Sequence, residues 1–262
     1  MAIVNVTPDS FYAESRMESV EGLCHRIDSV IAEGATIIDI GGYSSRPGAQ
    51  EVTLEEEWSR VRMGLEAVRN AERGAVVSID TFRAEVVRRA VEEFGAIIVN
   101  DISAGELDEG MLDVVARYKL PYIAMHMRGT PSTMQQMTHY DGGVTAGVVE
   151  YFRGRVRDLH EAGIAPENII LDPGFGFAKS AVQNFELLRG LPELRALGYP
   201  VLIGVSRKSM IYRSLDITPE ASLPGSLALA WETLRSGAAI LRVHDVAETV
   251  QVMRLWEIYN KI

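Results

Sequence analysis

Short apolar runs alternate with amphipathic stretches along most of the chain. Each run is rich in isoleucine and valine, as expected of a strand buried on both faces. The stretches between them, such as 55–71 and 83–94, place apolar residues at helical spacing, which predicts amphipathic helices. The eight predicted strands lie at 2–4, 36–40, 76–79, 96–99, 121–125, 168–171, 200–205 and 239–243.

Eight cycles of strand and helix in 262 residues favour an α/β fold of the (β/α)8 type, the TIM barrel. A doubly wound open sheet is the alternative that the same pattern allows. No linker rich in proline or serine divides the chain, so we expect residues 1–262 to form one domain. The longest loop-like stretch, 127–143, is long enough to be functional or mobile.

A polar residue ends nearly every predicted strand. In a closed parallel barrel all strands end at one face, where enzymes of this fold place their chemistry. The sequence therefore predicts one site made of residues that are distant along the chain. At any single position the alternative is a helix cap or a bond to loop backbone. The strand-end residues are Asn5, Asp80, Asn100, Asp101, His126, Asp172, Ser206, Arg242 and His244.

Composition narrows the possible partners. The formal net charge of -10 disfavours nucleic acid and anionic membranes, although a local cluster of arginine and lysine could still hold a small anion. The single cysteine, Cys24, excludes an intramolecular disulfide, and its place on an apolar helical stripe favours packing over catalysis. No apolar run approaches the length of a membrane span and no signal peptide is recognisable, so we expect a cytoplasmic protein.

The segment GVSRKSM, 204–210, is open to three interpretations: a nucleophile elbow, a phosphate-binding loop or a solvated basic turn. The elbow needs a second glycine where Lys208 stands, so Ser206 is a poor candidate for a nucleophile. A second segment, GFGFAKS, lacks glycine at a position that the P-loop requires. The histidines show no zinc-binding spacing.

The remaining polar residues fall into groups with different chemistry. Arg46, Arg242, His244 and Asn5 suit a phosphate or pyrophosphate, because guanidinium groups bind phosphate oxygens bidentately and Mg²⁺ takes amide oxygen ligands. A salt bridge across its loop is the alternative for Arg46.

The second group consists of Asp80, Asn100 and Asp172, which suit a flat heterocycle with several N–H and C=O edges. Lys208 could donate to such a ring, and Ser209 stands where a carboxylate could bind at a helix N-terminus.

Eight motifs in order over essentially the whole chain closely resemble dihydropteroate synthase. That family consists of (β/α)8 transferases of folate synthesis, typically homodimers. They join 6-hydroxymethyl-7,8-dihydropterin pyrophosphate to 4-aminobenzoate, which sulfonamide drugs mimic, and release pyrophosphate. The motifs are NVTPDSF, DIGGYSSRPGA, SIDTFRAEV, VNDISAG, MHMRGTP, DPGFGFAKS, GVSRKS and RVHDV.

The resemblance implies that Asn5 contacts Mg²⁺ and the pyrophosphate, which Arg46, Arg242 and His244 also hold. Ser45 takes the place of a threonine that is common in the family and keeps its hydroxyl. The implied pterin-binding set is Asp80, Asn100, Asp172 and Lys208, with Met125 and Phe177 as apolar walls. The residues implied to enclose 4-aminobenzoate are Ser209, Asp9, Phe11 and Pro47.

The mechanism that the resemblance implies is loss of pyrophosphate before the amine attacks. Arginines and Mg²⁺ then stabilise the leaving charge, while Asp80 and Asp172 stabilise a pterin cation. The residues expected to take part in catalysis are Asp80, Lys208, Arg242 and His244.

Two features differ from the family pattern. After NVTPDSF the chain continues with YAESR in place of SDGG, so Glu14 is the candidate replacement for an acidic loop residue. Family members also commonly carry a hairpin before the first strand, which we expect to be missing here. Two alternatives remain: a pterin-binding methyltransferase, which would not need the pyrophosphate-binding residues, and a non-catalytic pterin-binding paralogue.

Overall fold

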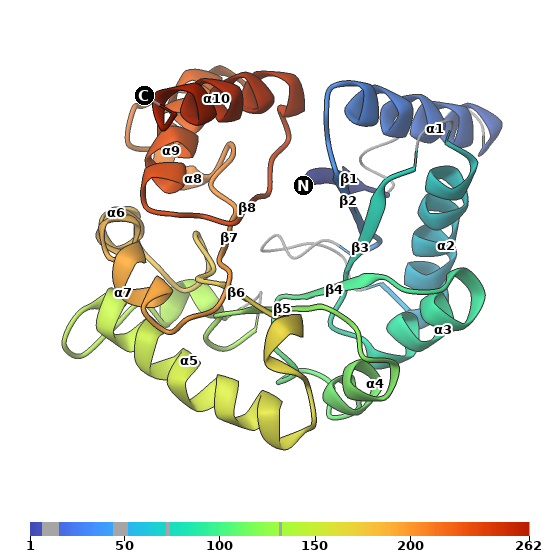
Figure 1. Ribbon diagram of the computed structural model, residues 1–262, viewed down its shortest axis with the longest axis horizontal. Coiled ribbons are helices and arrows are strands. Elements are labelled where there is room, and N and C mark those ends of the chain that lie inside the picture. Colours follow the sequence, from blue (N-terminus) through green and yellow to red (C-terminus); the bar gives the residue numbers. More distant parts are fainter. Residues whose placement is uncertain (7–15, 44–51, 72–73, 131–132, 262) are drawn as a thin grey trace.

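The computed structural model describes residues 1–6, 16–43, 52–71, 74–130 and 133–261. These residues contain eight parallel strands arranged in a ring, with helices on the outside (Figure 1). The strands are β1 (Ala2–Asn5), β2 (Ile37–Gly41), β3 (Val76–Asp80), β4 (Ile98–Asp101), β5 (Tyr122–Met125), β6 (Ile169–Asp172), β7 (Leu202–Ile203) and β8 (Ile240–Leu241).

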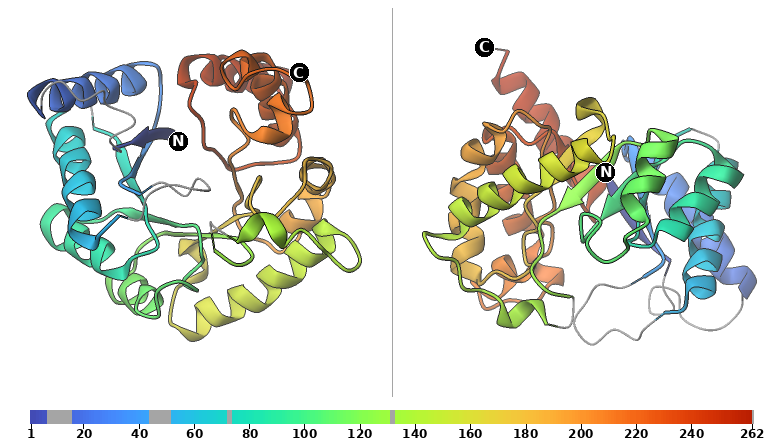
Figure 2. Two further views of the ribbon diagram at one scale, coloured as in Figure 1. Left: turned by 180° about the vertical axis from the view of Figure 1, so that it is seen from behind. Right: turned by 90° about the horizontal axis from the view of Figure 1, so that it is seen from below.

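The helices follow the strands in the predicted alternation, and views from behind and from below show them on the outside of the ring (Figure 2). Side-chain caps begin two of them: Thr53 and Glu56 form a capping box at α2, as do Ser180 and Gln183 at α6. The α-helices are α1 (Arg16–Ala32), α2 (Leu54–Asn70), α3 (Ala84–Phe94), α4 (Met111–Tyr118), α5 (Val144–Glu161), α6 (Ala181–Arg189), α7 (Leu191–Arg195), α8 (Ser209–Tyr212), α9 (Leu223–Arg235) and α10 (Val246–Tyr259).

The ring consists of a six-stranded sheet, β1 to β6, and a two-stranded sheet of β7 and β8. Single bridge pairs join the two sheets, Leu171 with Val201 on one side and Ala2 with Val243 on the other. Because the last strand returns to the first, the barrel prediction is confirmed, and the sheet is interrupted only at these two junctions. The doubly wound open sheet is therefore wrong.

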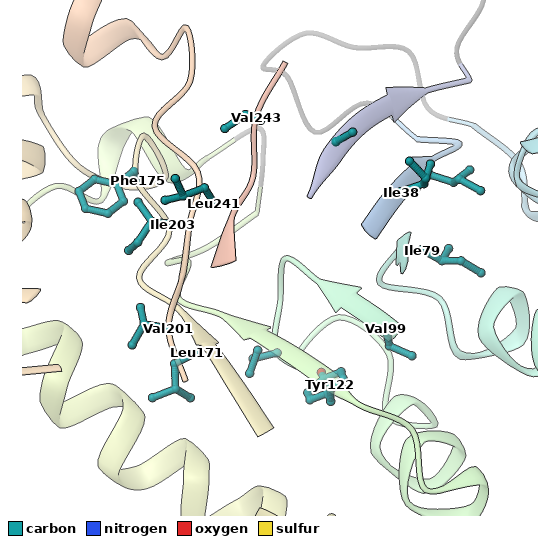
Figure 3. Close-up of a cluster of buried hydrophobic side chains, with 14 of the residues drawn as sticks. Ile38, Ile79, Val99, Tyr122, Leu171, Phe175, Val201, Ile203, Leu241 and Val243 are labelled. Carbon is teal, nitrogen blue, oxygen red and sulfur yellow. The ribbon is translucent and has the colours of Figure 1, made fainter. Parts of the chain in front are cut away.

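Alternate residues of each strand point to opposite sides of the ring. Outward-facing side chains such as Ile38, Ile79 and Leu171 belong to the large core between strands and helices (Figure 3). Cys24 packs against this core, as predicted. A separate apolar cluster inside the ring contains Ile98 of β4 and other inward-facing residues, and it forms the barrel floor below the polar strand ends.

None of the described helices is both long and apolar enough to cross a membrane.

Candidate active site

Inward-facing side chains from four strands form one hydrogen-bonded network near the carboxyl ends of the strands. Arg242, directly after β8, donates from Nε to Asp39 of β2 at 2.6 Å and from Nη2 to Asp80 of β3 at 2.7 Å. Asp39 also accepts from Ser78 Oγ at 2.6 Å and from Asn100 Nδ2 at 3.1 Å. Asp39 thus bonds two of the predicted site residues, Arg242 and Asn100, and Arg242 connects Asp80 to them.

The sequence prediction missed Asp39. It lies inside the apolar run 36–40, two residues before the strand ends, and its side chain is fully buried. A buried carboxylate is stable only with charged or hydrogen-bonding partners, so an aspartate in the middle of an apolar strand indicates an inward-facing polar site. This signal was present in the sequence.

Asp172 and Lys208 bring a second pair of charges from β6 and from the turn after β7. Asp172 accepts from the Gly174 N–H at 2.8 Å. Lys208 donates from Nζ to the Phe175 carbonyl and lies 4.9 Å from the centroid of the Phe177 ring. The charge of Asp172 acts on both Lys208 and Arg242, so this pair and the network around Asp39 belong to one site.

Burial changes the protonation equilibria of these groups. It lowers the pKa of Lys208 to about 8, although the carboxylate of Asp172 opposes the shift. Burial also raises the pKa of Asp80 and of Asp172, against the opposing charges of Arg242 and Lys208 respectively. Perturbed pKa values at charged groups that lie together are typical of functional sites.

The apolar walls of the site come from the loops after β4, β5 and β6. Met125 is buried in a cluster with Met127 and Met134, and Phe177 packs against it. Met134 belongs to the loop 127–143, whose described residues are fixed to α6 and the segment before it. Gln183 Nε2 donates to the Thr138 carbonyl at 2.6 Å, and the Tyr140 hydroxyl donates to the Ala178 carbonyl at 3.1 Å.

The two basic residues of GVSRKSM have different surroundings. Arg207, in the left-handed backbone region at φ 53°, forms a bidentate salt bridge with Asp245 at 2.9 and 2.7 Å. Lys208 instead enters the site, and Ser209 is half-buried at the start of α8. The hydroxyl of Ser206 lies 3.2 Å from His244 Nδ1, a contact that orients the imidazole.

Two strand-end residues do not reach the site, so the prediction that all of them converge is wrong for Asp101 and His126. Asp101 accepts from the backbone of Ser103 and from the Tyr122 hydroxyl, each at 2.8 Å. The His126 ring contacts Tyr151 of α5 on the helix side. Both follow an inward-facing residue, and strand alternation turns them outward.

Asn5 ends β1 and is half-buried. A Cβ added to the neighbouring Gly41 would lie 3.2 Å from Asn5 Oδ1, so this glycine leaves space beside the amide. Among the described residues no cluster of three or more histidine, cysteine or acidic side chains could hold a metal ion. The predicted residues Ser45, Arg46, Asp9, Phe11, Pro47 and Glu14 lie outside the described residues.

Comparison with known proteins agrees with the motifs. The family model of the pterin binding enzymes matches residues 1–244. Dihydropteroate synthase of Escherichia coli (strain K12) is 45% identical over 258 residues, which cover 98% of this chain and 90% of that protein.

Two solved structures are similar along their whole length. Dihydropteroate synthase of Xanthomonas albilineans with 4-aminobenzoic acid has a TM-score of 0.90 and 40% identity, covering 100% of this chain and 93% of that one. The Yersinia pestis dihydropteroate synthase in a sulfonamide drug complex has a TM-score of 0.90 and 38% identity, with 100% and 94% covered. By its motifs, its strand ring and these relatives, the chain belongs to the dihydropteroate synthases of the pterin-binding enzyme family.

Proposed function

We propose that the chain is a transferase that joins 6-hydroxymethyl-7,8-dihydropterin pyrophosphate to 4-aminobenzoate, giving 7,8-dihydropteroate and pyrophosphate in folate synthesis. The observation that carries this proposal is the convergence of carboxylates, an amide and two cations at one end of the strand ring, centred on Arg242. Such a set of side chains can bind both a heterocycle with polar edges and a charged leaving group.

In this proposal the pterin lies between the network of Asp39 and the turn that carries Phe177. Asp80, Asn100 and Asp172 offer groups for the N–H and C=O edges of the ring, and Lys208 offers a donor. Phe177 and Met125 form apolar walls for its faces. The proximity of the carboxyl groups of Asp39, Asp80 and Asp172 favours a ring that carries positive charge in the transition state.

The chemical step separates charge before a new bond forms. The bond between the pterin methylene carbon and the pyrophosphate oxygen breaks, and its electron pair leaves with the oxygen. Asp80 and Asp172 stabilise the resulting cation, while Arg242 and His244 bind the released anion. The amine nitrogen of 4-aminobenzoate then attacks the methylene carbon and gives up a proton to solvent. No protein nucleophile is required in this step.

We propose Mg²⁺ as the metal, with Asn5 as its protein ligand. Mg²⁺ usually keeps several waters and binds through one or two protein oxygens plus substrate phosphates, so a single amide oxygen beside Gly41, which has no side chain to crowd it, fits the ion. When bound, the ion would neutralise charge on the pyrophosphate. Arg46 and Ser45 complete the proposed anion site, and Ser209 the proposed 4-aminobenzoate site.

Turnover with purified protein tests the function. Mixing it with the pterin pyrophosphate, 4-aminobenzoate and Mg²⁺ should release pyrophosphate and form 7,8-dihydropteroate in equal amounts. A sulfonamide should compete with 4-aminobenzoate. Pterin binding without product would instead support a non-catalytic paralogue, and methyl transfer without pyrophosphate release would support the methyltransferase alternative.

We also propose that the chain acts in the cytoplasm as a homodimer that uses the outer face of α10. Leu255, Ile258 and Tyr259 of this helix are 59%, 58% and 64% exposed, and an apolar surface of this kind is typical of a protein interface. We expect Leu255→Glu to convert a dimer to a monomer in sedimentation experiments, whereas Val182→Glu, at a valine of α6 that is 77% exposed, should not. A wild-type monomer would contradict the proposal.

A further inference from the structure

The buried ammonium of Lys179 lies outside the set of groups that contact substrate in the proposed function. This side chain is 4% exposed and lies just before α6. Its Nζ donates to the Gly174 carbonyl at 3.0 Å and to the Phe177 carbonyl at 2.9 Å, and it lies 2.9 Å from His126 Nδ1. Burial lowers the pKa of Lys179 to about 7, and in the protonated form its three N–H bonds match these three acceptors.

His126 is the acceptor that fixes this ammonium to β5. Burial lowers the pKa of His126 well below its usual range, so the ring is neutral and Nδ1 can accept from Lys179. Tyr151 packs edge-on against the same ring, with the centroids 4.8 Å apart. Lys179 therefore ties the loop after β6 to a side chain that α5 holds in place.

The loop between these contacts has a conformation that few residues adopt without support. Gly174, Gly176 and Ala178 have φ of 68°, 83° and 52°, and for the alanine this left-handed conformation costs free energy. A Cβ on Gly174 would lie 2.0 Å from the His126 carbonyl oxygen, so the chain passes directly against β5. Such a turn persists only where its surroundings hold it.

Two lysines hold this turn from opposite sides. On the site side Lys208 donates to the Phe175 carbonyl and faces the Phe177 ring. On the helix side Lys179 donates to the carbonyls of Gly174 and Phe177, the residues on either side of that turn. Phe175 lies between Gly174 and Phe177, the two residues that Lys179 binds. A displacement of the turn would therefore move both the Phe175 carbonyl, which accepts from Lys208, and the Phe177 ring.

We propose that Lys179 is a positioning residue for pterin binding: through the carbonyls of Gly174 and Phe177 it sets the place of the Phe177 ring and of Lys208. This inference rests on the proposed function, because that function assigns the pterin to this side of the site. Lys179 contacts no substrate in it. Pyrophosphate, bound at Arg242 and His244 after β8, does not depend on the turn.

The test compares two ligands on the same protein. We expect Lys179→Met, which keeps the length but removes all three donors, to weaken binding of 6-hydroxymethyl-7,8-dihydropterin by about tenfold or more in calorimetry. Binding of inorganic pyrophosphate with Mg²⁺ should stay within about twofold of wild type. This measurement is the folding control, because a misfolded protein would lose affinity for both ligands. In turnover, KM for the pterin substrate should rise more than kcat falls.

Two further variants control for folding and for charge. Lys179→Gln keeps two N–H donors and should lose less pterin affinity than Lys179→Met. It serves as the test variant if Lys179→Met fails to fold. Lys179→Arg keeps the charge and should retain part of the pterin affinity. The exposed Lys119, changed to Met, should bind both ligands as wild type does. Unchanged pterin affinity, or equal losses for both ligands, would overturn the proposal. Wild-type protein that bound pyrophosphate but no pterin would contradict the proposed function and this inference with it.

Discussion

The two sides of the site are held by different means. On β2, β3, β4 and β8, side chains fix one another: Asp39 joins Arg242, Ser78 and Asn100 within the strand ring. On the side of β6 and β7, the turn 173–178 sets the positions of the site residues, and two lysines bind its backbone carbonyls. The first side depends on charge, and the second depends on the path of the backbone. Substitutions should therefore affect the two sides differently.

Removing the charge of Asp39 should have the largest effect. Asp39→Asn leaves the Nε of Arg242, a side chain that is 20% exposed, facing a buried amide, and we expect the free energy of unfolding to fall by about 3 kcal/mol in urea denaturation. Turnover should also drop, because Arg242 would lose its orientation. Asp141, whose side chain is 98% exposed, is the control, and Asp141→Asn should change stability by less than about 0.5 kcal/mol. Equal effects at both positions would show that the charge network does not hold this side.

A methyl group at Gly174 tests the backbone side. Gly174→Ala adds a left-handed alanine and a contact of 2.0 Å with the His126 carbonyl oxygen, and we expect a loss of about 2–3 kcal/mol in the free energy of unfolding. Gly198 has φ of 88° and open space around it, so Gly198→Ala should lose only about 1 kcal/mol. The difference in the free energy of unfolding between the two variants measures the cost of the close contact between residue 174 and the His126 carbonyl. If it vanished in thermal unfolding, the turn would not be pressed against β5.

The smallest expected effect is a change in pH dependence at Lys208. Because its pKa is lowered to about 8, this ammonium loses its proton above that pH, and pterin binding should weaken there. Lys208→Arg keeps its charge and should remove this alkaline decline from the profile of kcat/KM, even with lower activity. The control Lys119→Arg should keep the decline. An unchanged profile in Lys208→Arg would assign the decline to another group.

Stability should follow the opposite trend in the same pH range. Between about 8 and 10.5, the ordinary pKa of lysine, the unfolded chain holds the Lys208 proton and the folded protein does not. The unfolded state binds more protons, so the contribution of Lys208 to the free energy of unfolding rises with pH across this window.

The strand ring could be predicted from the sequence because apolar runs and helical periodicity reflect burial directly. The runs 200–205 and 239–243 form shorter strands than predicted, since hydrophobic pattern does not report where ladder bonds stop. Strand alternation could have separated Asn100 from Asp101, and Met125 from His126, but the site was assigned by position at the strand end alone. Lys179 could not be predicted, because its bonds depend on the three-dimensional path of a turn.

The pairing of the first strand with the segment after the last strand limits how far the chain can fold during its synthesis. Ile3 donates to the Val243 carbonyl at 3.0 Å, and Val243 donates back to Met1 at the same distance. The nascent polypeptide on the ribosome cannot form this seam until about residue 243 has emerged. Until then the edge of β1 is open to pairing with other chains, so chaperones that shield such an edge should raise the yield of active enzyme.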